Sequence, residues 1–264
     1  MHFWLRQNVG RQAGWLLFFS SILLAWAILF AMQPGLELSG PVWQGEAMQA
    51  LLALCQTSAS TAGYPVAFAM WALMSLAMMA PTSLPALKTY GELPSAAHLG
   101  SRGFIALFGG YLLIWFGFSL LAAGAQVVLA GANVLDMEGR SLLPVFNAFL
   151  LALAGAYQFS SLKEACLNSC RSPLMFFMAN WREGVGGAFM MGLRLGAICL
   201  GCCWALMLLA FVAGTMNLAF MGLATVLMVL EKLPQIGARV SAPLGAALLF
   251  AAALTLFIEY GPLT

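Results

Sequence analysis

The chain has 264 residues, of which 62% are hydrophobic and only 8% are charged, whereas about a quarter of a soluble domain is charged. This composition indicates an integral membrane protein and excludes an ordinary soluble domain. The net charge of +2 is too small for a nucleic-acid-binding surface, so nucleic acid is not an expected partner.

Seven stretches are apolar for long enough to be membrane-spanning helices. A hydrocarbon core about 30 Å thick needs roughly 20 helical residues at about 1.5 Å each. In chain order the stretches are 14–32, 64–84, 103–130, 142–159, 185–210, 213–230 and 242–258. The first is expected to be a retained helix, because no small-residue cleavage pattern follows it. The fifth and sixth are closely joined, and a single bent element there would leave six spans.

Basic residues predict the orientation of these spans, because they accumulate in cytoplasmic loops. When the loops are assigned in turn, one side holds only Arg140, and the other side holds nine basic residues: Arg6, Arg11, Lys88, Arg102, Lys163, Arg171, Arg182, Lys232 and Arg239. We therefore expect an all-α, polytopic transmembrane helical bundle of about seven spans. It is expected to be a single domain over 1–264 with its N-terminus inside, its C-terminus outside, and membrane lipid around it.

Methionines form a ladder on the second span. Met70, Met74 and Met78 recur every four residues, which places them on one helical face. A thioether is neutral and soft, so it tolerates an apolar environment and prefers Cu(I) to hard cations. Methionine is also an ordinary filler of apolar cores, and that interpretation stays open. Pro81 and Pro85 are expected to bend or end this helix.

A second sulfur stripe follows on the fifth span, with Met191, Leu195, Cys199, Cys203 and Met207 at four-residue spacing and Cys202 beside them. Sulfurs from this stripe and from the second span could form a two- to four-coordinate site, which suits Cu(I). The alternative is that the buried thiols are small hydrophobic groups. Most of the cysteines fall in or beside spans or on the inner side, which argues against a disulfide framework.

A third cluster lies in the predicted inner loop after the fourth span. If that segment is helical, Cys166 and Cys170 share a face, flanked by Lys163 and Arg171, whose charge favours the metal-binding thiolate. The pair could receive or hand over a metal, act as a thiol redox pair, or be inert.

Charged residues near the spans give two further expectations. Arg194 lies about ten residues into the fifth span, where burial of a charge is costly, so an interior position beside a polar partner is expected; snorkelling is the alternative. Glu231 and Lys232 close the sixth span, and a local ion pair is expected between them.

The residues that are missing argue against catalysis. The two histidines, His2 and His98, lie outside the predicted spans, which excludes an intramembrane bis-histidine haem, a histidine-rich copper oxidase centre and an intramembrane HExxH protease. The chain also has no nucleotide-binding glycine-rich loop. We therefore expect no enzyme and no catalytic residues.

These clusters resemble the bacterial family of predicted metal-binding integral membrane proteins related to a membrane copper chaperone that serves a tyrosinase-type polyphenol oxidase. The resemblance covers most of the chain from the second span onward. It is carried by Trp71, Met74, Ala77, Met78, Met79, Pro81, Tyr157, Gln158, Lys163, Cys166, Cys170, Arg171, Pro173, Trp181, Arg182, Gly184, the run from Gly192 through CLGCCWALM to Asn217, Glu231 and Lys232.

The resemblance implies a multi-pass protein of the bacterial inner membrane that handles copper. With the orientation predicted from the basic residues, its C-terminus is expected in the periplasm. It also implies a histidine where this chain has Leu195. That departure leaves two interpretations: the site is all sulfur, or the chain has kept the fold and lost the metal.

The leading hypothesis is a protein that binds Cu(I) for delivery to a cuproenzyme. Its expected metal ligands are Cys199, Cys202, Cys203, Met74, Met78, Cys166 and Cys170. The alternative is a non-catalytic accessory subunit of a larger membrane complex, which would dock a partner on the aromatic face of the third span.

Overall fold

The computed structural model describes residues 2–32, 63–96, 98–136, 138–215 and 217–260, and this part of the chain is all-helical apart from one isolated bridge between Leu135 and Ser141. The all-α class is therefore confirmed. In chain order the helices are α1 (His2–Ala31), α4 (Tyr64–Thr82), α5 (Leu84–Glu92), η1 (Pro94–Ala96), α6 (Gly100–Gly131), α7 (Pro144–Tyr157), α8 (Ser161–Arg171), α9 (Pro173–Asn180), α10 (Gly184–Leu208), α11 (Ala210–Ala213), α12 (Leu218–Lys232) and α13 (Gly237–Tyr260).

Five segments within the described residues are long and apolar enough to cross a membrane: Gln12–Ala31, Tyr64–Thr82, Gly100–Gly131, Gly184–Ala213 and Arg239–Tyr260. A sixth crossing results if α7 and α8, which meet at a bend of 60°, are taken together. The helix in the region of the predicted sixth span, α12, has 15 residues and is shorter than a usual span. The structure thus supports five or six spans, and the count of seven stays a prediction.

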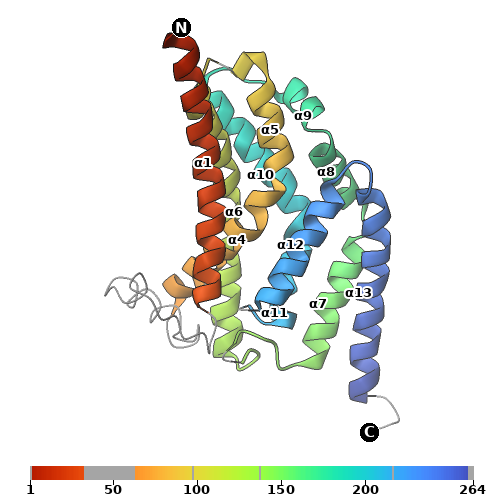
Figure 1. Ribbon diagram of the computed structural model, residues 1–264. Helices are drawn as coiled ribbons and strands as arrows, with labels where there is room; N and C mark the ends of the chain where they lie inside the picture. The colour runs from red at the N-terminus through yellow and green to blue at the C-terminus, as the bar shows by residue number, and fades with distance from the viewer. Residues whose placement is uncertain (1, 33–62, 97, 137, 216, 261–264) are drawn as a thin grey trace.

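The helices form an elongated bundle in which α4, α6, α10 and α12 surround the interior (Figure 1). Contacts join α4 to α6, α6 to α10, α10 to α12 and α12 to α4, so α4 and α10 face each other diagonally. α1 covers α4 and α6, and α13 packs on α7. The chain runs in the same direction along α4 and α12 and in the opposite direction along α10, and its two ends lie at opposite ends of the bundle (Figure 1).

Glycines allow the closest helix contact, between α6 and α10. A Cβ atom on Gly192 would lie 2.0 Å from the carbonyl oxygen of Leu107, and one on Gly110 would lie 2.3 Å from that of Phe189. Both distances are impossible for real atoms, so only glycine lets these backbones meet. The contact brings the interior faces of the two helices together.

The helices are interrupted at two places, between α4 and α5 and after α11. Helix α4 ends at Thr82, directly after Pro81, and α5 begins at Leu84, which confirms the expected effect of the prolines. After α11 the chain turns at Gly214, whose φ of 98° is in the left-handed region that favours glycine. This turn separates α12 from α10, so the two sequence stretches form separate helices.

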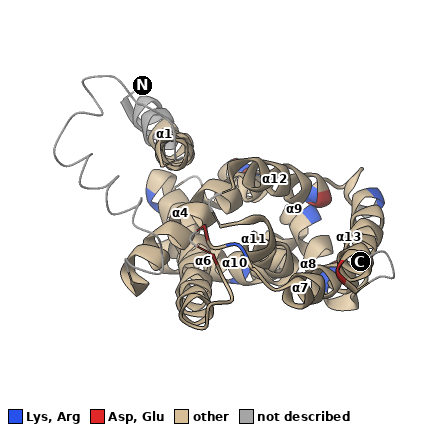
Figure 2. Cartoon of the chain, turned by 90° about the horizontal axis from the view of Figure 1, so that it is seen from below, with Lys and Arg blue, Asp and Glu red and all other residues tan. Residues whose placement is uncertain are grey.

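The outer surface of the bundle is apolar, as lipid contact requires. Leu23 on α1, Leu121 on α6 and Phe250 on α13 are each at least 70% exposed. Charged residues are sparse along the ribbon in the view from below (Figure 2). The aromatic residues of α6 point inward instead: Tyr111 and Trp115 are at most 1% exposed. Phe116 and Phe118 of the same helix are half-buried, so part of the aromatic face expected on the third span packs inside the chain, and docking of a partner there stays a prediction.

Candidate metal centre

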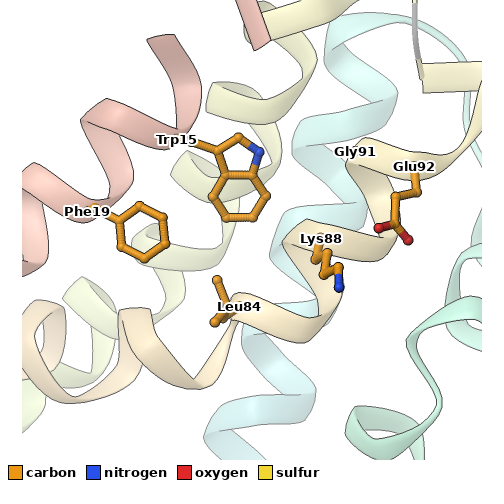
Figure 3. A pocket seen from close by; sticks show the side chains of 6 residues that line it. All are labelled: Trp15, Phe19, Leu84, Lys88, Gly91 and Glu92. Carbon is orange, nitrogen blue, oxygen red and sulfur yellow. The ribbon is translucent and has the colours of Figure 1, made fainter. Parts of the chain in front are cut away.

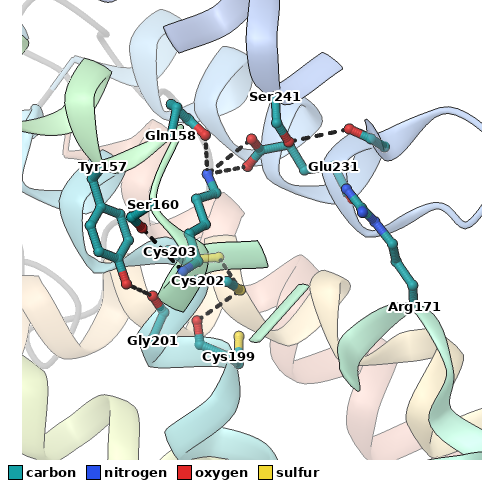
Figure 4. A network of polar contacts seen from close by, with 12 residues as sticks. Tyr157, Gln158, Ser160, Arg171, Cys199, Gly201, Cys202, Cys203, Glu231 and Ser241 are labelled. Carbon is teal, nitrogen blue, oxygen red and sulfur yellow. Dashed lines mark hydrogen bonds and ion pairs between the residues drawn. The ribbon is translucent and has the colours of Figure 1, made fainter. Parts of the chain in front are cut away.

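Three thiols lie together in the interior on α10. The sulfur atoms of Cys199, Cys202 and Cys203 are all within 4.8 Å of one another, and none of the three residues is more than 1% exposed. The Cys202 and Cys203 sulfurs are 3.3 Å apart, and the Cys202 thiol donates to the Cys199 carbonyl at 3.1 Å. Figure 4 shows Cys202 and Cys203 side by side, and Cys199 precedes them by about one helical turn. In the part of the chain that the structure describes, this is the one group of three or more residues with metal-ligand geometry.

Three polar groups from other helices surround the Cys199 sulfur. The Lys232 ammonium at the end of α12 donates to Cys199 Sγ at 2.9 Å and to Thr82 Oγ1 at 2.7 Å. The Tyr111 hydroxyl of α6 lies 3.0 Å from Cys199 Sγ and donates to the Met79 carbonyl at 2.8 Å. Thr82 Oγ1 lies 3.7 Å from the same sulfur. Helices α4, α6, α10 and α12 therefore converge on one thiol.

Lys232 places a positive charge beside the thiols in the buried interior of the bundle. The residue is 5% exposed, and a buried ammonium is stabilised by an anionic neighbour. The one ion pair among the described residues joins Lys163 to Glu231 and leaves Lys232 outside it. Cys199 is thus the ionisable group that Lys232 contacts through a hydrogen bond.

The expected pair of Glu231 with Lys232 is therefore wrong. The Glu231 carboxylate accepts from the Lys163 ammonium of α8 through both oxygens at 2.9 Å, and both side chains are 1% exposed. Lys163 also donates to the Gln158 side chain, and Arg171 Nε donates to the Glu231 carbonyl at 2.9 Å. Figure 4 shows this network beside the thiols. Adjacent helical residues do not face the same way, so Glu231 fixes α8 while Lys232 reaches α10.

The second cysteine pair is helical, as the shared-face hypothesis required. The Ser160 side chain caps α8 by accepting from the Lys163 backbone N–H at 3.1 Å, and the helix carries Cys166 and Cys170. Both cysteines are half-buried and pack on the core.

These two thiols point to the cluster on α10. A Cβ atom on Gly201 would lie 2.7 Å from Cys166 Sγ. The Cys166 side chain therefore packs against Gly201, which directly precedes Cys202. Helix α8 packs on α10, and Cys170 lies one turn after Cys166 on the same face of α8. The five cysteines in the described residues are free, and they form one group that reaches from the half-buried α8 face into the interior. Cys55 lies outside the described residues.

The predicted methionine ladder faces the interior. Met74 and Met78 are each 1% exposed on α4, and Met207 is 1% exposed on α10. Two further methionines that the sequence analysis did not single out, Met221 and Met228 on α12, are fully buried. The interior of the bundle is therefore rich in thioether sulfur from three helices.

Arg194 does not take the interior position expected from its depth in α10. Its side chain is exposed and donates to Asn180 Oδ1 at the end of α9 at 2.6 Å. The helix turns this residue away from the face that carries Leu195 and Cys199, because neighbouring residues lie about 100° apart around the axis. The snorkelling alternative fits this outward position.

A separate pocket of about 540 Å³ lies between α1 and α5 (Figure 3). It is lined by Trp15, Phe19, Leu84, Lys88, Gly91 and Glu92. None of these residues carries sulfur, so the pocket is distinct from the cysteine cluster.

The donors grouped at the candidate centre are three thiols, and buried methionine thioethers lie in the same interior of the bundle. His98 is exposed in the connection before α6, so it does not contribute a nitrogen ligand. Soft sulfur donors select Cu(I) over hard cations such as Mg²⁺ or Ca²⁺. Three residues outside the predicted ligand set also belong to the centre: Lys232, Tyr111 and Thr82. The only sequence signal for them was a lysine at the end of an apolar stretch.

A family model described as a copper chaperone, PpoB2, matches residues 68–255. The matched region runs from within α4 to within α13 and contains all the cysteines described above. No curated protein and no solved structure matches the chain significantly.

Proposed function

The chain belongs to this copper chaperone family, and on that premise we propose that it binds Cu(I) inside a membrane and hands it to a cuproenzyme. The proposed ligands are Cys199, Cys202 and Cys203, with Met74 and Met78 as further sulfur donors. The observation that carries the proposal is the cluster of three buried thiols within 4.8 Å. It lies inside the matched region, as copper binding by this family requires.

The charges around the cluster suit a monovalent ion. Two thiolates and one Cu(I) have a net charge of −1, and the Lys232 ammonium next to Cys199 brings the group to zero. A neutral group costs far less to bury than an ion. Lys232 would thus let two cysteines bind copper as thiolates without water.

Zinc fits this donor set less well. A structural Zn²⁺ site takes four ligands that are usually cysteine or histidine, and the cluster offers three thiols and no histidine. A fourth thiolate would have to come from Cys166 or Cys170 on α8, and four thiolates around Zn²⁺ leave a net charge of −2, which is costly to bury. Neutral thioethers, which are ligands for Cu(I), add no charge. The absence of the family's expected histidine at Leu195 is thus compatible with an all-sulfur copper site.

We propose that Cys166 and Cys170 pass copper to the buried cluster. They are half-buried on α8, whereas Cys199, Cys202 and Cys203 are closed off from solvent. Cys166 lies against Gly201, next to Cys202, and this closeness would let the ion exchange one thiolate for another over a short distance. In this proposal the protein is a non-catalytic carrier in the bacterial inner membrane.

The test is the copper content of the reduced, detergent-purified protein after loading with Cu(I), measured by elemental mass spectrometry. We expect about one or more copper ions per wild-type chain and a loss of copper in the Cys199→Ser, Cys202→Ser, Cys203→Ser triple variant. Cys55→Ser is the matched control and should retain copper. Wild-type protein without copper, or a triple variant with undiminished copper, would refute the proposal.

A further inference from the structure

We propose that Met228 on α12 is a copper ligand that acts with Met78 on α4 and Cys203 on α10. This inference rests on the proposed function and extends it, because it assigns a thioether from a third helix to the site. Met228 is fully buried, Met78 is 1% exposed and Cys203 is fully buried.

The first step is a fixed level in the bundle where three helices touch. Lys232 Nζ of α12 lies 2.7 Å from Thr82 Oγ1 of α4 and 2.9 Å from Cys199 Sγ of α10. Thr82 Oγ1 lies 3.7 Å from the same sulfur. These contacts bring the side-chain ends of Thr82, Cys199 and Lys232 together at one height along the bundle.

The second step is one helical turn from that level. Helices α4 and α12 run in the same direction and α10 runs in the opposite one (Figure 1). Four residues back from Thr82 and Lys232 are Met78 and Met228, and four residues on from Cys199 is Cys203. Each step keeps the helical face and advances about 6 Å. Three sulfurs from three helices thus reach the next level together.

A second contact, between the first half of α4 and α11, shows that α4 and the α10–α11 segment advance side by side beyond the Thr82–Cys199 contact. The ring centroids of Trp71 and Phe211 are 5.4 Å apart. Trp71 lies 11 residues before Thr82, and Phe211 lies 12 residues after Cys199. These steps correspond to about 16 Å and 18 Å along the helices, so the two segments advance together. Met78 and Cys203 lie between the two fixed contacts and stay level.

The chemistry of this level differs from that of the Cys199 level. One thiolate, two neutral thioethers and one Cu(I) form a complex with no net charge. Such a complex needs no neighbouring ammonium and is tolerated in an interior without water. Cys203 belongs to both levels, because its sulfur also lies within the three-thiol cluster.

The test uses selenomethionine-labelled protein, reduced and loaded with Cu(I). X-ray absorption at the copper edge detects selenium bound to copper, and competition with a Cu(I) chelator measures affinity. We compare wild type with Met78→Leu and Met228→Leu, singly and combined. Leucine conserves volume, so the fold should persist. Met221→Leu is the matched control, since Met221 is equally buried on α12 but seven residues farther from the Lys232 level.

We expect copper–selenium scattering in wild type and in Met221→Leu, and a clear decrease of it in the combined variant, in which Met74 is the one proposed thioether donor left. Cu(I) affinity should fall by at least about tenfold in that variant, as it does when groups that support a metal site are removed. Wild-type protein that binds copper without a selenium signal, or a signal unchanged by the combined variant, overturns this inference alone. Wild-type protein that binds no copper overturns the proposed function as well.

Discussion

Lys232 and Cys199 form the contact on which the electrostatics of the site depend. The ammonium lies 2.9 Å from the sulfur in a region that excludes water. In the proposed copper complex it would balance the charge left by two thiolates. An alternative consequence is also testable: the ammonium could compete with copper for the same sulfur.

Replacing Lys232 distinguishes these two roles. We predict that Lys232→Met lowers the Cu(I) affinity by about 10- to 1,000-fold, because a unit charge at about 4 Å is worth up to about 4 kcal/mol at an effective dielectric of about 20. Chelator competition at neutral pH measures the change, and Lys232→Arg, which keeps the charge, is the control. An unchanged or higher affinity in Lys232→Met would mean that the ammonium does not support copper binding.

The neighbouring residue, Glu231, has a structural role on the opposite side of the same helix end. It holds the Lys163 ammonium with both carboxylate oxygens, and the two side chains are 1% exposed. We predict that Glu231→Gln lowers the free energy of unfolding by about 3–5 kcal/mol, because it leaves a buried ammonium unpaired. Thermal unfolding in detergent measures the loss.

The control for that prediction removes both charges. The Lys163→Met, Glu231→Leu double variant should recover most of the stability, since an apolar pair can replace a buried ion pair. If the double variant is as unstable as Glu231→Gln, the cost is lost packing rather than an unpaired charge.

At the scale of helices, the α6–α10 contact positions Tyr111 against Cys199. A Cβ atom on Gly110 would lie 2.3 Å from the Phe189 carbonyl oxygen, whereas one on Gly109 would meet nothing within 4 Å. The two adjacent glycines therefore have opposite roles: Gly110 permits the contact and Gly109 faces open space.

This pair gives a matched experiment. We predict that Gly110→Ala destabilises the protein by about 1–3 kcal/mol through overpacking, despite alanine's better helix propensity. Gly109→Ala should be neutral or stabilise by up to about 1 kcal/mol. Thermal unfolding in the same detergent compares them. Equal stability of the two variants would contradict the close approach of α6 and α10.

At the scale of the whole molecule, periodicity made the helices and their buried faces predictable. The stripes containing Met74 and Met78 and Cys199 and Cys203 are buried as expected, because a four-residue spacing marks one helical face. The sequence could not reveal that α8 packs on α10. Its polar residues resemble a loop, and Lys163 is buried only because Glu231, 68 residues away, neutralises it.

Lys232 and Met228 were missed for a related reason. A lysine at the end of an apolar stretch is typical of a membrane boundary, so its buried contact with Cys199 depends on how four helices meet. A signal for Met228 was present, since Met221, Met228 and Lys232 are spaced by seven and four residues and share a face. Periodicity predicts that such a face is buried, but it does not predict which sulfur lies opposite.

The topology makes a prediction about the two chain ends, which lie at opposite ends of the bundle (Figure 1). With α7–α8 and α12 both counted as crossings, the chain would cross seven times, and with the N-terminus inside, as the basic residues predict, the end of α13 would lie outside the cytoplasm. We predict that alkaline phosphatase fused after α13 is active and that green fluorescent protein fused there is dark. The reverse result would contradict the predicted orientation: either the bundle is inverted in the membrane, or one of these two segments does not cross.

The most direct test of copper binding by the sulfur cluster is the X-ray absorption spectrum at the copper edge of the reduced, Cu(I)-loaded wild-type protein. The account predicts a copper ion in the monovalent state with two to four sulfur neighbours and no nitrogen or oxygen in its first shell. A first shell of nitrogen or oxygen, or protein that retains no copper, would contradict it.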